Sequence, residues 1–189
     1  MDGLPRSNRK LTARPRKYGF HGTLRPPFRL AHGLTQGELQ ELTSDLARKL
    51  QPVTLDGLTV APLGPFLAFR PISESAALAD LATQVVETTN TWRAPLSAEE
   101  YARRNPDRLS LHQRALLDRW GYPFVMEAFQ FHMTLTGPLP PEEQDQVQPL
   151  LAQYFEDCVP RPYPISDLSL IGEAEDGRFR LLSRHPLGA

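Results

Sequence analysis

The stretch GFHGTLRPPF, residues 19–28, has a counterpart far downstream in QFHMTLTGPLP, residues 130–140. Aligned on His21 and His132, the two stretches share five of eight positions in the pattern Phe-His-x-Thr-Leu-x-x-Pro. In each copy a threonine follows the histidine by two positions, so an extended backbone would place both side chains on one face. The repeat therefore predicts two related halves, each presenting a His-x-Thr pair.

The alternation of residue types around both motifs indicates strands. Polar residues occupy every second position over residues 17–25 and again over residues 129–136, which predicts one strand in each region. On the first of these strands Tyr18 would point away from His21.

The sequence between and after the two motifs predicts helices and hairpins. Capping signatures at Thr35, Ser97 and Ser110 predict three helices, of which the first runs to about Leu50 and the third stops before Gly121. An apolar stripe through Leu78 predicts one more helix. Further predictions are strands in residues 53–60 and 64–71, a helix over residues 142–157 that Pro149 kinks or splits, and a hairpin of residues 165–174 and 178–186. The predicted class is α+β, with antiparallel sheets packed by helices.

Composition narrows the class of protein. The chain has 189 residues, 40% hydrophobic and 23% charged, with a net charge of −1, which is typical of a globular protein and not of a disordered one. The first 29 residues carry eight basic residues against one acid, Asp2. This cluster indicates either an anionic partner near His21 or a solvated basic arm, and both interpretations stay open.

Cysteine usage and hydropathy suggest a cellular compartment. Cys158 is the single cysteine, which excludes an internal disulfide and a thiolate-rich zinc site. No run approaches the length of a membrane helix, and the basic start lacks the apolar stretch of a signal peptide. We expect a cytoplasmic protein with no membrane partner.

Two imidazoles and two hydroxyls around one ligand would suit phosphodiester chemistry. A neutral imidazole can take a proton from water while a protonated one donates a proton to a leaving alkoxide. Thr23 and Thr134 can donate hydrogen bonds to phosphoryl oxygens. If His21 and His132 face one cleft, the set predicts metal-free opening of a phosphodiester.

Four strings, YGFHGTLRPPF, WRAPLSAEEYARR, WGYPFV and FQFHMTLTG, resemble the 2H phosphoesterases, in the branch associated with phosphonate metabolism. The resemblance runs from about Tyr18 to the C-terminal hairpin. It implies a bilobal, pseudo-twofold fold with a central cleft, and hydrolysis or reversible ligation at cyclic phosphates or 2′-5′ bonds without a required metal. It gives the catalytic roles to His21, Thr23, His132 and Thr134.

This resemblance also implies how residues 1–189 are organised as a single bilobal domain. The expected parts are a basic arm over residues 1–16, a first lobe over about 17–91, a helical connection over about 92–128 and a second lobe over about 129–189. Because family members have a hydrophobic strand before the first motif and residues 1–16 are polar, we expect the first lobe to lack that strand. An open sheet edge would then allow a homodimer.

Three further residues are candidates for binding the substrate. Arg25 stands where the family has lysine and would bind phosphate through its planar donors, while Gly22 replaces the family's alanine. Tyr18 and Tyr122 are the other candidates, each with packing as the alternative. No His-x-His pair or carboxylate spacing indicates a metal, so no cofactor is expected.

The sequence leaves three functions open. The preferred one is an enzyme that opens a small cyclic phosphate, such as a phosphorylated ribose cyclic phosphate. The alternatives are processing of RNA ends that carry 2′,3′-cyclic phosphates or 2′-5′ links, for which a nearly neutral chain offers little extended basic surface, and a phosphate-binding protein that performs no chemistry.

Overall fold

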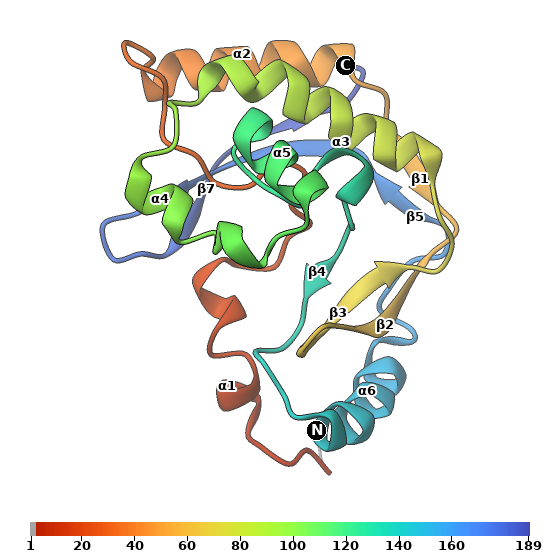
Figure 1. Ribbon diagram of the computed structural model, residues 1–189. Helices are drawn as coiled ribbons and strands as arrows, with labels where there is room; N and C mark the ends of the chain where they lie inside the picture. The colour runs from red at the N-terminus through yellow and green to blue at the C-terminus, as the bar shows by residue number, and fades with distance from the viewer. Residues whose placement is uncertain (1–2) are drawn as a thin grey trace. The chain divides into compact units, whose positions relative to one another are not determined.

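The computed structural model of the protein describes residues 3–189 and confirms the α+β class, with α-helices and antiparallel sheets (Figure 1). The chain forms two compact units. Unit 1 contains the residues up to Thr23, Pro52–Ser75 and Phe131–Arg184, and unit 2 contains Leu24–Gln51, Ala76–Gln130 and His185–Ala189. Both His-x-Thr motifs therefore belong to unit 1.

The main sheet of unit 1 consists of three antiparallel strands in the order β2-β3-β4: β2 (Leu58–Leu63), β3 (Phe66–Pro71) and β4 (Met133–Thr134). Helix α6 (Pro141–Phe155) packs against β2 and β3 (Figure 1). Leu67 of β3 and Val147 of α6 are fully buried. Apolar side chains of this kind stabilise a fold by leaving water.

Two smaller sheets lie in unit 1, apart from the last two residues of β7, which belong to unit 2. Strand β1 (Val53–Leu55) pairs with β5 (Tyr163–Ile165), and β6 (Asp167–Glu173) pairs with β7 (Phe179–Pro186). The predicted C-terminal hairpin is confirmed: Gly177 has a φ of 72°, and the Asp176 carboxylate accepts a hydrogen bond from the Arg178 N–H. The strand predicted over residues 53–60 is instead two strands, β1 and β2, which pair with different partners.

The basic N-terminal segment packs within unit 1. It contains α1 (Asn8–Leu11) and the 3-10 turn η1 (Pro15–Lys17), and no strand lies in its described part, residues 3–16. Leu11 is buried, its carbonyl accepts a 2.7 Å hydrogen bond from the Gly137 N–H, and Arg6 forms a 2.7 Å ion pair with Glu143. The segment thus packs through Leu11 while its basic side chains stay largely exposed, and residues 1–2 lie outside the described part.

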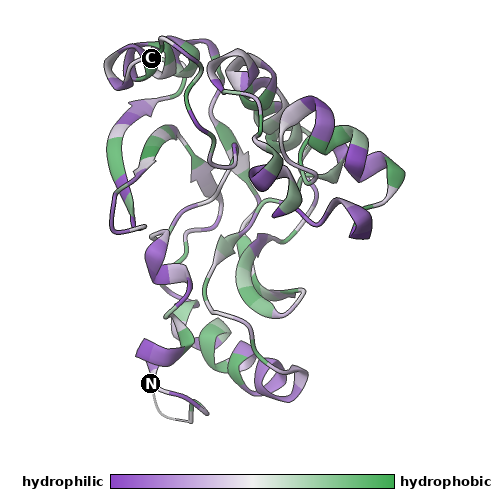
Figure 2. Ribbon diagram, turned by 60° about the vertical axis from the view of Figure 1, so that its left-hand side comes forward, coloured by the Kyte–Doolittle hydropathy of each residue, from purple (hydrophilic) through white to green (hydrophobic). Residues whose placement is uncertain are grey.

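Unit 2 is mainly helical. Its helices are α2 (Gln36–Lys49), α3 (Ala76–Thr89), α4 (Ala98–Ala102) and α5 (Leu111–Trp120), with 3-10 turns η2 (Asn90–Trp92), η3 (Pro106–Arg108) and η4 (Met126–Ala128). The capping boxes predicted at Thr35 and Ser97 are present in full, and Ser110 caps α5 in the same way. The longer helices carry both hydrophobic and hydrophilic residues, as Figure 2 shows.

The strands predicted around the two motifs are much shorter than expected. Residues 17–25 contribute only an isolated bridge at Gly22, and residues 129–136 form a strand only at Met133–Thr134. Before the first motif, the 3-10 turn η1 and Gly19 at a φ of 73° break the extended backbone, and Pro26 with Pro27 follows the motif. Alternation of side chains alone does not supply the partner that extends a strand.

Among residues 3–189, no helix combines the length and the apolar character needed to cross a bilayer.

Candidate functional site

The two motifs lie side by side in unit 1, joined at their centres. Gly22 and Met133, the middle residues of the two His-x-Thr sequences, form an antiparallel bridge. In antiparallel pairing the next residues out are also opposite each other, which places His21 across from Thr134, and Thr23 across from His132. Alternation then puts these four side chains on the face opposite Met133. All four are partly exposed.

The second motif is positioned by strand β3. Ala68 pairs with Thr134 and Phe69 with Met133. Immediately after Thr134, the N–H groups of the next two residues both donate to the Leu67 carbonyl, at 2.9 and 3.2 Å. Leu135 and Thr136 thus lie opposite the single residue Leu67, which is the arrangement of a β-bulge. A bulge ends regular strand pairing and redirects the side chains.

The first motif is held against the second by close packing at Gly22. A Cβ atom built on Gly22 would lie 2.5 Å from two ring carbons of Phe131. Phe131 is itself buried, so its ring cannot simply move into solvent. The glycine therefore lets the backbone of the first motif approach the ring directly.

His21 has the properties of a neutral imidazole at neutral pH. Burial lowers its pKa below the ordinary value of 6.5, and the nearby His132 lowers it further. The backbone at Gly19 and Tyr18 acts in the opposite direction without reversing the shift. Although these carbonyls lie near, the buried Nδ1 atom makes no hydrogen bond of good geometry within the described chain. The Nε2 atom lies 3.1 Å from the Thr23 hydroxyl.

Two ring contacts involve residues of the motifs or next to them. The His132 ring lies 5.9 Å from the Phe66 ring, centroid to centroid. Tyr18, a predicted substrate contact, is 43% exposed and lies 5.2 Å from Phe179. The exposed fraction leaves much of the Tyr18 side chain accessible, so a role in binding stays a prediction.

The other two predicted contacts, Arg25 and Tyr122, belong to unit 2. Arg25 lines a pocket of about 40 Å³. Tyr122 packs against the cluster of Val86, Leu116, Trp120 and Val125 and lies under the Arg104 guanidinium, 4.9 Å from its ring centroid. Its ring thus has a clear packing role.

Within residues 3–189, no group of three or more His, Cys, Asp or Glu side chains is arranged to hold a metal ion.

Residues 23–180 match the family described as "Protein of unknown function (DUF1045)". This chain belongs to the DUF1045 family. The matched range includes Thr23, Arg25 and the whole second motif, and His21 lies two residues before it.

Two curated proteins are similar to this DUF1045 chain. One is "Ribose 1,5-bisphosphate phosphokinase PhnN" of Janthinobacterium sp. (strain Marseille), 36% identical over 182 residues, which are 94% of this chain and 40% of that protein. The other carries the same name in Laribacter hongkongensis (strain HLHK9), 34% identical over 168 residues, which are 87% of this chain and 38% of that protein. The DUF1045 chain thus spans about two fifths of their length.

Arg93 of this DUF1045 chain has no predicted role from the sequence, although the residue stands in the string WRAPLSAEEYARR. The structure places Arg93 in the same pocket as Arg25. The two residues are far apart in the sequence, and the contact depends on backbone pairing of Arg29 and Ala31 with Ala94 and Trp92. The one local signal for Arg93 is its position four residues before the predicted capping box at Ser97.

Proposed function

We propose that this DUF1045 protein is a metal-independent phosphoesterase that opens a small cyclic phosphate. The observation that carries the proposal is the antiparallel pairing of Gly22 with Met133, which supports a shared site for the histidine and the threonine of each motif. Acid and base on adjacent backbone segments are what concerted proton transfer requires.

His21 is assigned the role of general base, because a lowered pKa keeps its imidazole neutral. In the proposed reaction His21 takes a proton from water, and the water oxygen forms a bond to phosphorus. The bond from phosphorus to one ring oxygen breaks, and His132 donates a proton to that oxygen. The product is a phosphomonoester with a free hydroxyl group.

Thr23 and Thr134 are assigned the role of donating hydrogen bonds to the phosphoryl oxygens of the substrate. A hydroxyl donor aimed at an oxygen that gains charge in the transition state stabilises that state more than the ground state. Before substrate binds, Thr23 contacts the Nε2 atom of His21, which also orients the imidazole ring.

The class of substrate is supported by the relatives. Both are named for a phosphorylated ribose, ribose 1,5-bisphosphate, and this favours a phosphorylated ribose cyclic phosphate over RNA. A role in phosphonate metabolism rests on the family resemblance of the motifs. The phosphokinase activity in their names is not proposed here, because the chain contains no Gly-x-x-x-x-Gly-Lys-Ser/Thr sequence to hold a nucleotide.

A substrate panel tests the proposal. The purified protein, treated exhaustively with EDTA, is expected to convert a ribose cyclic phosphate that carries a 5-phosphate into its phosphomonoester, followed by phosphorus NMR. EDTA should leave the rate unchanged, because proton transfer needs no Lewis acid in this mechanism. Faster turnover of an RNA 2′,3′-cyclic end or a 2′-5′ dinucleotide would favour RNA processing instead. Activity lost to EDTA and restored by zinc would contradict the metal-free mechanism, and absence of turnover on every substrate would favour a binding protein.

The pH dependence of kcat/KM is a second test. Protonating His21 at low pH removes the base, so activity should fall as the pH drops through the pKa of His21, and this acid limb should have its midpoint below pH 6.5. The alkaline limb would reflect loss of the acid, and both apparent values belong to the coupled pair. A midpoint of the acid limb at or above pH 7 would contradict the assignment of His21 as the base.

A further inference from the structure

A pocket in unit 2 is lined by arginines. Its volume of about 40 Å³ exceeds the room that one water molecule needs by the same measure, about 10–15 Å³. Its lining contains four arginines and one glutamate: Arg25, Arg29, Arg93, Arg104 and Glu100. The pocket is therefore strongly positive.

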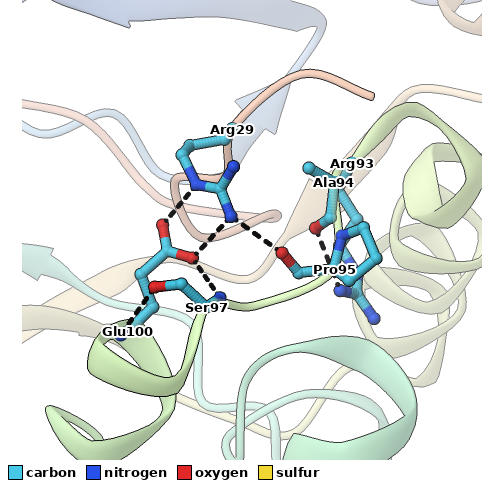
Figure 3. Close-up of polar contacts among 6 residues, drawn as sticks. All are labelled: Arg29, Arg93, Ala94, Pro95, Ser97 and Glu100. Carbon is cyan, nitrogen blue, oxygen red and sulfur yellow. Dashed lines mark hydrogen bonds and ion pairs between the residues drawn. The ribbon is translucent and has the colours of Figure 1, made fainter. Parts of the chain in front are cut away.

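Glu100 does not neutralise the other three arginines, because its carboxylate is already paired with Arg29. The Arg29 Nε and Nη2 atoms donate to the two Glu100 carboxylate oxygens at 2.8 and 2.9 Å, and this hydrogen bonding lowers the pKa of Glu100 to about 2. Figure 3 shows the Glu100 carboxylate turned toward Arg29, while the Arg93 guanidinium lies on the other side of Pro95. Within residues 3–189, no ion pair joins Glu100 to Arg25, Arg93 or Arg104.

Arg25 is partly buried without a counter-charge. Its Nε and Nη1 atoms are buried and have no hydrogen-bond partner among residues 3–189. Burial, with a contribution from the nearby charge of Arg93, lowers the pKa of Arg25 to about 10. The side chain is still cationic at neutral pH. The Arg25 guanidinium carbon lies over the Phe28 ring, 5.5 Å from the ring centroid.

Arg93 is held rigidly beside it by neutral groups. Its Nε atom donates to the Asn90 side-chain oxygen at 2.9 Å, and its Nη2 atom donates to the Arg119 carbonyl at 3.0 Å. A Cβ atom at Gly121 would lie 3.2 Å from the Arg93 guanidinium carbon. The glycine thus leaves space for the guanidinium to lie against the backbone, and no carboxylate in residues 3–189 pairs with it.

Two neighbouring guanidinium groups without an acid repel each other, and the repulsion is strong where water is excluded. An anion between them would remove this cost and satisfy the unpaired N–H donors of Arg25. We propose that this pocket binds a phosphoryl group between Arg25 and Arg93. Guanidinium donors match the tetrahedral oxygens of phosphate, and a positioned, preformed pair loses little freedom on binding. Arg104 adds positive charge at the same pocket.

Calorimetric titration of the full chain with inorganic phosphate and with ribose 5-phosphate tests the proposal. Wild type should bind both saturably, and Arg25→Gln or Arg93→Gln should weaken binding by on the order of 10- to 100-fold, because each removes charge-assisted hydrogen bonds. Arg93→Lys should bind phosphate little better than Arg93→Gln does, since lysine lacks the planar guanidinium group with its several donors. The matched control is Arg48→Gln, which removes the same charge from an exposed position on α2 and should change binding less than about twofold.

Melting of the unliganded variants separates binding from folding. Arg25→Gln removes a desolvated, unpaired charge, so its melting temperature should equal or exceed that of wild type, while the rise caused by phosphate should disappear. The double variant His21→Ala/His132→Ala should keep the phosphate binding that Arg25→Gln removes, so failure of the proposed reaction would not overturn the proposed binding pocket. Absence of saturable phosphate binding, equal weakening by Arg48→Gln, or tighter binding of acetate than of phosphate would overturn the proposal.

Discussion

Replacing either His21 or His132 by alanine is expected to lower kcat on the preferred cyclic phosphate by on the order of 10²–10⁴, the usual contribution of a positioned general acid or base. Steady-state assays at saturating substrate measure the loss. The double variant should cost less than the product of the two single losses, because the residues act as one unit. Thr23→Val and Thr134→Val each remove one donor and should cost less, on the order of 10²–10³.

The controls separate chemistry from folding. His32→Ala removes an exposed histidine of unit 2 and should leave kcat unchanged. Thr136→Val removes the buried hydroxyl oxygen that accepts a 3.0 Å hydrogen bond from the Leu67 N–H, so it should lower the free energy of unfolding by about 1–3 kcal/mol without a catalytic effect of the same size. Near-wild-type turnover by His21→Ala or His132→Ala would show that the paired motifs are not a catalyst.

Leu67→Ala is expected to lower the free energy of unfolding by about 2–5 kcal/mol, because it leaves a cavity at a side chain with 0% exposure. The residue lies on β3, whose backbone holds the second motif through Leu135 and Thr136. Urea denaturation followed by circular dichroism gives the change. Since natural domains have only about 5–15 kcal/mol of stability, this one substitution removes a large share of it.

Leu111→Ala is the matched control for that loss. The Leu111 side chain is 87% exposed at the start of α5, so the same truncation should change stability by less than about 0.5 kcal/mol. Equal losses in the two variants would mean that Leu67 is not packed as described.

Local signals explain why the helices and the C-terminal hairpin could be predicted. A capping box such as that of Ser97 with Glu100 is complete within four residues, and the turn at Gly177 needs only its own backbone conformation. Strand lengths around the motifs could not be predicted in this way. They depend on partners distant in the sequence, on Gly19 in a left-handed conformation, and on the bulge opposite Leu67.

The same difference between local signals and long-range contacts applies to the candidate site. The repeated pattern around His21 and His132 pointed to two motifs that the fold pairs with each other, because repetition is visible without a structure. The surroundings of Arg25 carried no such signal. Its proximity to Arg93 follows from pairing between two segments of unit 2, and the lack of an acid beside it appears only when side chains are placed.

The bridge between Gly22 and Met133 also bears on how such a site can arise. Two copies of one strand related by a rotational symmetry axis pair in antiparallel fashion, so a homodimer of half-length subunits could form the same bridge and the same four side chains. In such a dimer both histidines would have identical surroundings and could not specialise. Once both copies are encoded in a single polypeptide, each can acquire mutations independently. Burial lowers the pKa of His21, and a single polypeptide can acquire such a change at one copy of the motif alone.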